Sequence, residues 1–389
     1  MRNISHKKPK QAKRSLSRYK LFLILAGSLL VGYLIGHHIT PLPKETPAPL
    51  KTSGVEIKKI LSASDPKEQD AWYLKLIKRV GPEEAQDDLE HSGIVFTGET
   101  HLLNHTVGNY IWKKYGAAGL SKCKDYFSSS CYHGFVLNAI GDGNVKNIDA
   151  IMKECKKQGL SNYAQCAHAV GHGFLAYVGY ANLLEAINLC DQTKQRVPDF
   201  EVSYCHNGVF MENVFGLHEG KPSALRWIKA DDILYPCDDP RLEERYLPQC
   251  WYNQALQLNN VLHGDFVRIA NICDSVQGKD NKYMCFDGVF RGLHSRTQND
   301  IARKFSSCRQ MPTDWINHCI AIQTSASFQQ GDRVLPFTIC AMTKFGQKEC
   351  YEELAKMIDY DHHNGEDTSK LCNRIPAEYR KINCRLTNG

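Results

Sequence analysis

The chain has 389 residues and a formal net charge of +6. Eight of its 48 lysines and arginines, and none of its 42 acidic residues, lie in the first twenty positions, so the remainder holds 40 basic residues and is close to neutral. This remainder has no basic field for nucleic acid, which excludes a nucleic-acid-binding function.

The N-terminal region has the features of a membrane anchor. The basic residues 1–20 precede a long uncharged run that begins LFLILAGSLLVGYLIG. Such a pattern predicts either a signal peptide or a transmembrane helix. Because no clean A-x-A cleavage site follows, we favour an uncleaved anchor over residues 21–39. The positive-inside rule then places the tail in the cytoplasm and the rest of a single-pass protein in the extracellular or periplasmic space.

Three small residues, Ser28, Gly32 and Gly36, lie four apart within this anchor. They would form one narrow helix face, which suits dimerisation through close helix packing. The alternative is ordinary glycine content of a membrane helix.

A proline-rich segment follows the anchor. Residues 40–54 hold four prolines, which predicts a semi-rigid stalk that lifts a domain off the membrane. Entry helices are expected over residues 55–97. One of them is the segment KEQDAWYLKLIKRV, with Asp65 as its N-cap and Pro66 at its first position.

All sixteen cysteines lie in the last region, residues 98–389. Taken in order they form eight close pairs, and the second members of these pairs recur after 31 to 45 residues. A period near 35 residues predicts a repeat architecture. Each period holds an apolar segment, a glycine-bearing break and an amphipathic segment, so we expect an all-α fold of αα-hairpins that stack as a solenoid. This layout is similar to that of the disulfide-stapled Sel1-like and tetratricopeptide repeat proteins of bacteria, in its period and its paired cysteines.

Export makes disulfides the expected state of these cysteines. The chain has no C-x-x-C motif, which counts against zinc ribbons, iron–sulfur clusters, thioredoxin-like sites and c-type haem. Two registers suit hairpin geometry: bridges across the loops between hairpins, or bridges across the mouth of each hairpin. The second register leaves Cys123 and Cys384 without partners, so we expect the first. Its pairs are Cys123–Cys131, Cys155–Cys166, Cys190–Cys205, Cys237–Cys250, Cys273–Cys285, Cys308–Cys319, Cys340–Cys350 and Cys372–Cys384.

Histidines recur with the same period in the first four units. The candidate metal ligands are His101, His105, His133, His168, His172 and His206. Two pairs have H-x-x-x-H spacing, which puts both imidazoles on one face of a helix, as a metal site needs. Neighbouring helices lie about 10 Å apart, so imidazoles from adjacent units would converge. With Glu212 as a carboxylate ligand or a base, the set suits one transition metal ion: zinc, iron or manganese.

The interpretation that we place first is that these histidines are structural and were copied with the repeat, and a metal site comes second. The later units lack the early histidine although their cysteines persist, and this asymmetry favours a function.

No G-x-S-x-G, P-loop or G-x-G-x-x-G motif is present. We therefore predict a membrane-anchored extracytoplasmic repeat protein that acts as a binding or scaffold module, with a groove for a protein, peptide or glycan. The competing hypothesis is a histidine-ligated metal-binding protein or a metal-dependent enzyme, either a hydrolase or an oxidoreductase, with its centre in the N-terminal repeats. The sequence leaves open whether the protein is an enzyme.

Overall fold

The computed structural model describes residues 53–63, 65–92, 98–124, 126–127, 129–141, 147–216, 225–229, 231–297, 299–329, 332–363 and 369–380. Within these ranges every regular element is helical, as the sequence predicts. The expected tail, the expected anchor at 21–39 and most of the expected stalk lie outside the described residues. Among the residues described, no helix combines the length and apolar character needed to span a membrane.

The entry region contains α2 (Ser53–Leu61), α3 (Pro66–Val80) and α4 (Pro82–Glu90). The Asp65 side chain accepts a hydrogen bond from the Lys67 backbone N–H, and Pro66 occupies the first turn of α3. This cap confirms the helix start predicted from the sequence, because an aspartate satisfies a backbone donor that proline at the first position does not need.

The remaining helices fall into two sets. In the first set, which we call the row helices, each helix packs on the next one along the chain. The row helices are α5 (Gly98–Tyr115), α6 (Ser130–Gly141), α8 (Leu160–Val178), α10 (Val202–Phe215), α11 (Leu247–Val261), α13 (Lys279–Thr297), α15 (Ile316–Gln329) and α17 (Gln347–His363).

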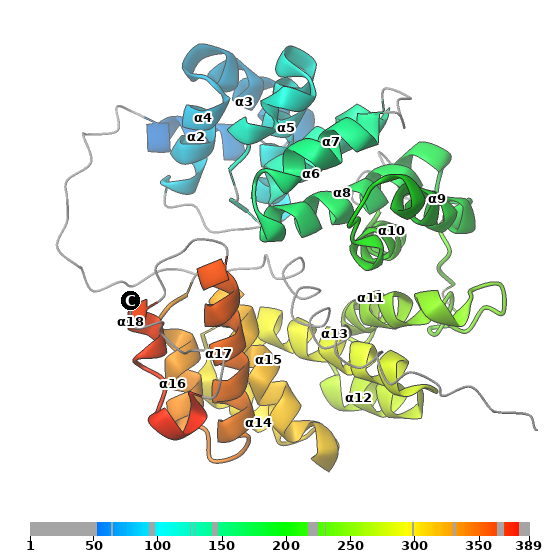
Figure 1. The fold of residues 1–389 in the computed structure, drawn as a ribbon, viewed down its shortest axis with the longest axis vertical. Coiled ribbons are helices and arrows are strands. Elements are labelled where there is room, and N and C mark those ends of the chain that lie inside the picture. Colours follow the sequence, from blue (N-terminus) through cyan, green and yellow to red (C-terminus); the bar gives the residue numbers. More distant parts are fainter. Residues whose placement is uncertain are drawn as a thin grey trace, which may run out of the picture.

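The second set, which we call the flanking helices, packs against the row helices. The flanking helices are α7 (Asn147–Lys156), α9 (Leu183–Arg196), α12 (Phe266–Ser275), α14 (Ile301–Cys308) and α16 (Leu335–Met342). A short α18 (Ser369–Cys372) follows α17, and four 3₁₀ helices lie at Ala117–Lys122, Glu244–Tyr246, Thr313–Trp315 and Ala377–Tyr379. Figure 1 shows α2 to α10 in one half of the molecule and α11 to α18 in the other.

Seven disulfides join successive units, with Cα–Cα distances of 5.4 to 6.3 Å. They are the first seven of the eight pairs expected across the loops between hairpins. Cys372 is also disulfide-bonded, and its expected partner, Cys384, lies outside the described residues. Because disulfides persist in oxidising surroundings, these bridges indicate an oxidising, extracytoplasmic environment for the domain.

The row helices begin before their cysteines. α8 begins at Leu160 and α13 begins at Lys279, six residues before Cys166 and Cys285. Gly159, with a φ of 95°, precedes the first residue of α8 as its N-cap. No proline or glycine lies between Gly159 and Cys166, so the helix continues through the cysteine. The histidines of α8 therefore lie inside a helix.

Paired row helices touch through their backbones. A Cβ atom on Gly134 of α6 would lie 2.2 Å from the His105 carbonyl oxygen of α5, and one on Gly108 would lie 2.1 Å from the Cys131 carbonyl oxygen. Only glycine leaves room for such an approach. The glycines that follow the cysteines in the sequence thus have a packing role, and this crossing brings His105 beside His133.

Candidate metal centre

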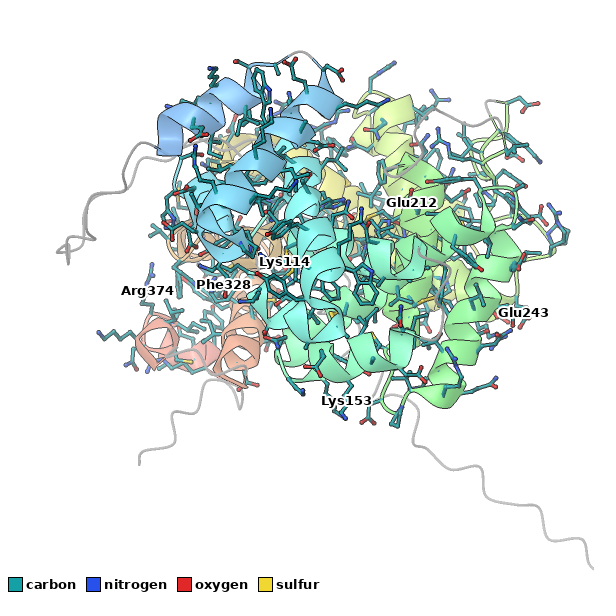
Figure 2. The ribbon with its side chains drawn as sticks, turned by 90° about the horizontal axis from the view of Figure 1, so that it is seen from above. Lys114, Lys153, Glu212, Glu243, Phe328 and Arg374 are labelled. Atoms are coloured by element: carbon teal, nitrogen blue, oxygen red, sulfur yellow. A yellow bond between two sulfur atoms is a disulfide. The ribbon has the colours of Figure 1, made fainter. Side chains whose placement is uncertain are left out.

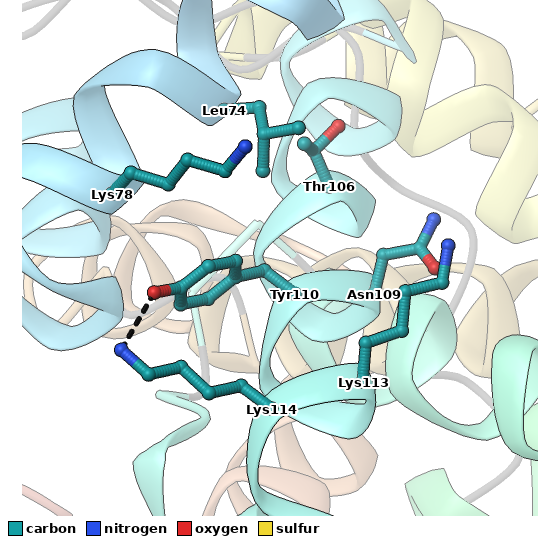
Figure 3. Close-up of a pocket in the computed structure, with 7 residues that line it drawn as sticks. All are labelled: Leu74, Lys78, Thr106, Asn109, Tyr110, Lys113 and Lys114. Carbon is teal, nitrogen blue, oxygen red and sulfur yellow. Dashed lines mark hydrogen bonds between the residues drawn. The ribbon is translucent and has the colours of Figure 1, made fainter.

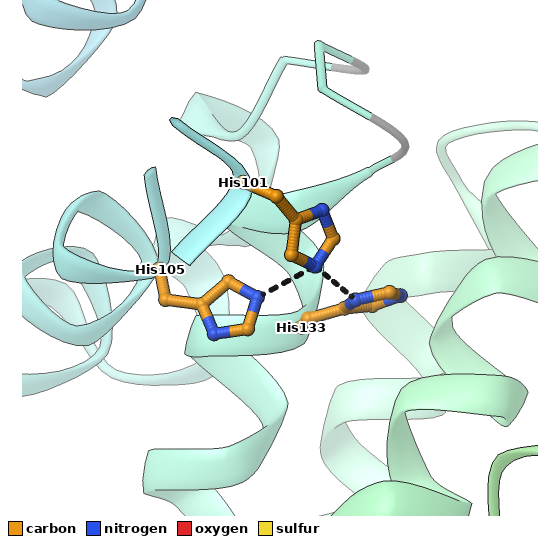
Figure 4. A group of neighbouring side chains, drawn as sticks. All are labelled: His101, His105 and His133. Carbon is orange, nitrogen blue, oxygen red and sulfur yellow. Dashed lines mark hydrogen bonds between the residues drawn. The ribbon is translucent and has the colours of Figure 1, made fainter. Parts of the chain in front are cut away.

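Three imidazoles from α5 and α6 meet at the first of these crossings (Figure 4). The Nε2 atom of His101 lies 3.0 Å from Nε2 of His105 and 3.3 Å from Nδ1 of His133. One ring nitrogen from each of the three residues lies within 4.8 Å of those of the other two. His105 and His133 are buried, while His101 is partly exposed. We call His101, His105 and His133 the histidine triad.

The backbone fixes the tautomer of His101. Its Nδ1 lies 2.7 Å from the Phe127 carbonyl oxygen, which can only accept a hydrogen bond, so Nδ1 carries the proton and Nε2 presents a lone pair. One lone pair accepts one well-aligned N–H donor, yet two nitrogens lie close to it. A cation that accepted all three nitrogens would resolve this conflict.

The spacing of the triad fits such a cation. Zinc–nitrogen bonds are about 2.1 Å long, so two nitrogens bound to one ion at angles of 90° to 109° lie roughly 3.0 to 3.4 Å apart. The two distances to His101 fall in this range. A carbonyl behind a ligating histidine is also the usual support for such a ligand.

Burial prepares His133 as a ligand. Desolvation, and then the neighbouring histidines, hold the pKa of His133 well below its ordinary range. The ring is therefore neutral, which is the form that binds a metal without first losing a proton from its ligating nitrogen. Its second nitrogen, Nε2, is buried and has no hydrogen-bond partner among the described residues.

A second histidine pair lies on α8, beside the triad. His168 and His172 are fully buried, and their Nε2 atoms lie 2.7 Å apart. Nδ1 of His172 lies 2.7 Å from a carboxylate oxygen of Glu212 on α10, whose other oxygen accepts a hydrogen bond from the Tyr180 hydroxyl. The ring centres of His168 and His172 lie 5.6 and 5.5 Å from that of His133, so five histidines form one continuous cluster.

Glu212 is hydrogen-bonded to His172, and neither of its oxygens is left open as a metal ligand. It is fully buried, and both of its oxygens are bonded; in Figure 2 it lies among the helices, whereas Lys153 and Glu243 lie at the periphery. A carboxylate on Nδ1 holds the proton there and leaves Nε2 as a ligand atom. We expected Glu212 to be a ligand or a base, and its position suits an orienting role instead.

The structure does not bring the sixth candidate, His206, into the cluster. Its Nε2 lies 3.0 Å from an Asp191 carboxylate oxygen and its ring packs edge-on against Tyr246, with centroids 4.9 Å apart. The reason is its register: His206 follows Cys205 by one residue, whereas His133 and His168 follow their cysteines by two. One residue turns a helix by about 100°, so His206 faces elsewhere.

Asn207 occupies the position two residues after Cys205. Burial and the nearby His172 lower the pKa of His168, while a polar contact from Asn207 opposes this shift. Asn207, Tyr180 and the Phe127 carbonyl are not among the site residues that the sequence predicts. The cysteine register would have identified Asn207, but no sequence pattern marks the other two.

A surface cleft lies between α3 and α5 (Figure 3). It has a volume of about 380 Å³ and is lined by Leu74, Lys78, Thr106, Asn109, Tyr110, Lys113 and Lys114. Its three ammonium groups repel a metal cation, so this cleft is not a second candidate for the metal site.

Comparison with protein-family models, with curated proteins and with solved structures finds no match. The interpretation of the histidine cluster therefore depends on its geometry.

Proposed function

We propose that this protein is an exported metal-binding protein whose histidine triad holds a transition metal ion. The observation that carries the proposal is the convergence of one His105 nitrogen and one His133 nitrogen on Nε2 of His101, where a proton can satisfy one contact and a metal ion satisfies both. The neighbouring imidazoles of α8 and the depressed pKa of His133 support the same conclusion.

The ligand set favours zinc or iron over manganese. Imidazole nitrogen suits zinc and iron, whereas manganese prefers the oxygen ligands that the triad lacks. Three protein ligands leave one position open, as in catalytic zinc sites, where the bound ion lowers the pKa of a water molecule. The partial exposure of His101 gives solvent and small molecules access to this side.

We also propose that residues 21–39 anchor this domain on the outer side of a membrane, in keeping with its disulfides. A groove for a protein, peptide or glycan, and dimerisation through Ser28, Gly32 and Gly36, stay predictions. The triad gives the metal hypothesis a specific residue set, so we place it ahead of the scaffold hypothesis.

The test is elemental analysis of the purified full chain, produced in an oxidising compartment without a polyhistidine tag. We expect at least one equivalent of zinc or iron, and a loss of one equivalent in His105→Ala. The matched control is His206→Ala, which removes a buried histidine outside the cluster and should keep the metal content of the wild type. A chain without metal, even after incubation with Zn²⁺, would refute the proposal.

A further inference from the structure

The α8 histidine pair repeats the local geometry of the α5 pair. His168 and His172 are four residues apart with Nε2 atoms 2.7 Å apart, and His101 and His105 are four residues apart with Nε2 atoms 3.0 Å apart. Each pair has one ring whose Nδ1 is held from behind: the Phe127 carbonyl holds His101, and a carboxylate holds His172. In each pair this leaves a lone pair pointed at a second imidazole nitrogen.

His133 lies between the two pairs. Its Nδ1 faces His101 at 3.3 Å, and its ring centre is 5.5 Å from that of His172. Figure 4 shows the other nitrogen of His133 pointing away from His101 and His105. This Nε2 is buried and has no partner among the described residues, and an unpaired buried polar atom costs about 1–3 kcal/mol. A ligand for Nε2 would remove that cost.

We propose that the cluster holds two metal ions and that the His133 ring bridges them. The second ion would be bound by Nε2 of His168, Nε2 of His172 and Nε2 of His133, while Nδ1 of His133 belongs to the triad. On binding, the 2.7 Å between the two Nε2 atoms on α8 would open to the roughly 3.0 to 3.4 Å of two nitrogens on one ion. This inference depends on the proposed function of the triad. A second ion would explain why the fully buried pair on α8 accompanies the triad and why Nε2 of His133 has no partner within the part of the chain that the structure describes.

The bridge requires one proton to leave. A neutral imidazole has one N–H, so His133 releases that proton to solvent when the second ion binds, and each ring nitrogen then donates one lone pair to one ion. Glu212 and Tyr180 complete the arrangement behind the second ion. The Glu212 carboxylate accepts a hydrogen bond from Nδ1–H of His172. Its negative charge would then lie behind His172, on the side of the ring away from the added cation.

The experiment is a titration of the metal-free full chain with Zn²⁺, read by isothermal calorimetry, on the wild type and four single variants. We expect two equivalents in the wild type and in His206→Ala, and one in His105→Ala and in His172→Ala. His133→Ala should weaken both sites at least tenfold, because it removes a ligand from each ion. Far-ultraviolet circular dichroism shows which variants have folded.

A measurement on the wild type tests the bridge even where His133→Ala does not fold. The chain loaded with two equivalents of Cu²⁺ should give an electron paramagnetic resonance spectrum of two coupled ions, which an imidazolate bridge transmits, and not twice the spectrum of one equivalent. Two uncoupled spectra would overturn the bridge. One equivalent of Zn²⁺ in the wild type, lost in His105→Ala and kept in His172→Ala, would overturn the second site and leave the proposed function intact. No bound metal would overturn both.

Discussion

The contact between α5 and α6 predicts that alanine destabilises the protein at one glycine of α6 and has no effect at another. Gly134 lies against α5, and a Cβ atom there would meet the His105 carbonyl oxygen at 2.2 Å and its Cα at 2.6 Å. Gly141, at the end of the same helix, is exposed and has no atom within 4 Å of such a Cβ. We therefore compare Gly134→Ala with Gly141→Ala.

The magnitude follows from these distances. Carbon atoms in contact prefer separations of about 3.5–4.0 Å, so α5 and α6 must move apart by about 1 Å to accept a methyl group at Gly134. Overpacking of a core costs about 1–3 kcal/mol, and here the obstacle is backbone, which favours the upper part of that range. Alanine returns up to about 1 kcal/mol of helix propensity. We expect Gly134→Ala to lose about 2 kcal/mol of unfolding free energy and Gly141→Ala to lose none.

The metal site should respond more strongly than stability does. Metal–ligand distances tolerate errors of about 0.2 Å, and a shift of about 1 Å would carry His105 away from His133. We expect at least a tenfold loss of Zn²⁺ affinity in Gly134→Ala, measured by competition with a chelator, and thermal unfolding in the metal-free state reports stability separately. Equal unfolding free energies and equal Zn²⁺ affinities for Gly134→Ala and Gly141→Ala would refute a close backbone contact between α5 and α6.

Three further predictions concern other parts of the domain. Glu212→Gln should lower the affinity for the second Zn²⁺ ion by about 10–100-fold, because it weakens the group that orients a ligand, and calorimetry measures this. Joint replacement of Cys155 and Cys166 by serine opens a bridge that spans 11 residues and should lower the unfolding free energy by about 2–3 kcal/mol, measured with urea. Burial lowers the pKa of Lys304 to about 7, whereas an unfolded lysine titrates near about 10.4. Between these two pKa values the unfolded chain binds one more proton at Lys304 than the folded chain does. The free energy of unfolding should therefore rise by about 1 kcal/mol per pH unit from pH 7 to pH 9. Urea unfolding at pH 7, 8 and 9 should show this rise in the wild type and not in Lys304→Met.

The disulfide register and the helical repeat could be read from the sequence because both depend on spacing along the chain. Cysteines 8 to 15 residues apart close short loops, and a period near 35 residues fits one pair of helices. The same reasoning found the two H-x-x-x-H pairs, since four residues make about one helical turn. The prediction was wrong for His206, because the direction of a side chain depends on how many residues separate it from the preceding cysteine. His206 follows Cys205 by one residue and not by two.

Spacing along the chain does not predict which side chains of different helices contact each other. That Glu212 of α10 meets His172 of α8 depends on the angle at which two helices cross, and the crossing depends on backbone contacts at Gly171 and Gly208. A Cβ on either glycine would lie 2.0 Å from a carbonyl oxygen of the partner helix. Small residues in a helix indicate that a neighbour approaches, but they do not identify the neighbour.

The same crossing recurs in the C-terminal half with different chemistry. A Cβ on Gly288 of α13 would lie 2.4 Å from the Tyr252 carbonyl oxygen of α11, as Gly134 meets His105. Tyr252 and Asp287, each two residues after a cysteine, are therefore the counterparts of His105 and His133. Both are buried, and the Tyr252 hydroxyl and both Asp287 carboxylate oxygens have no hydrogen-bond partner among the described residues.

The crossings in the two halves share their backbone contact but differ in the side chains that they bury. The repeat provides a buried crossing with close backbone contact between α5 and α6, between α8 and α10, and between α11 and α13. Burial at that position lowers the pKa of His133 and raises the pKa of Asp287 to about 6, since burial disfavours whichever form is charged. Both residues are thereby driven toward neutrality, but a neutral imidazole is a metal ligand, whereas a protonated carboxylic acid is a hydrogen-bond donor. The crossing is therefore architectural, and under the proposed function the residue two positions after the cysteine decides whether it can contribute a metal ligand.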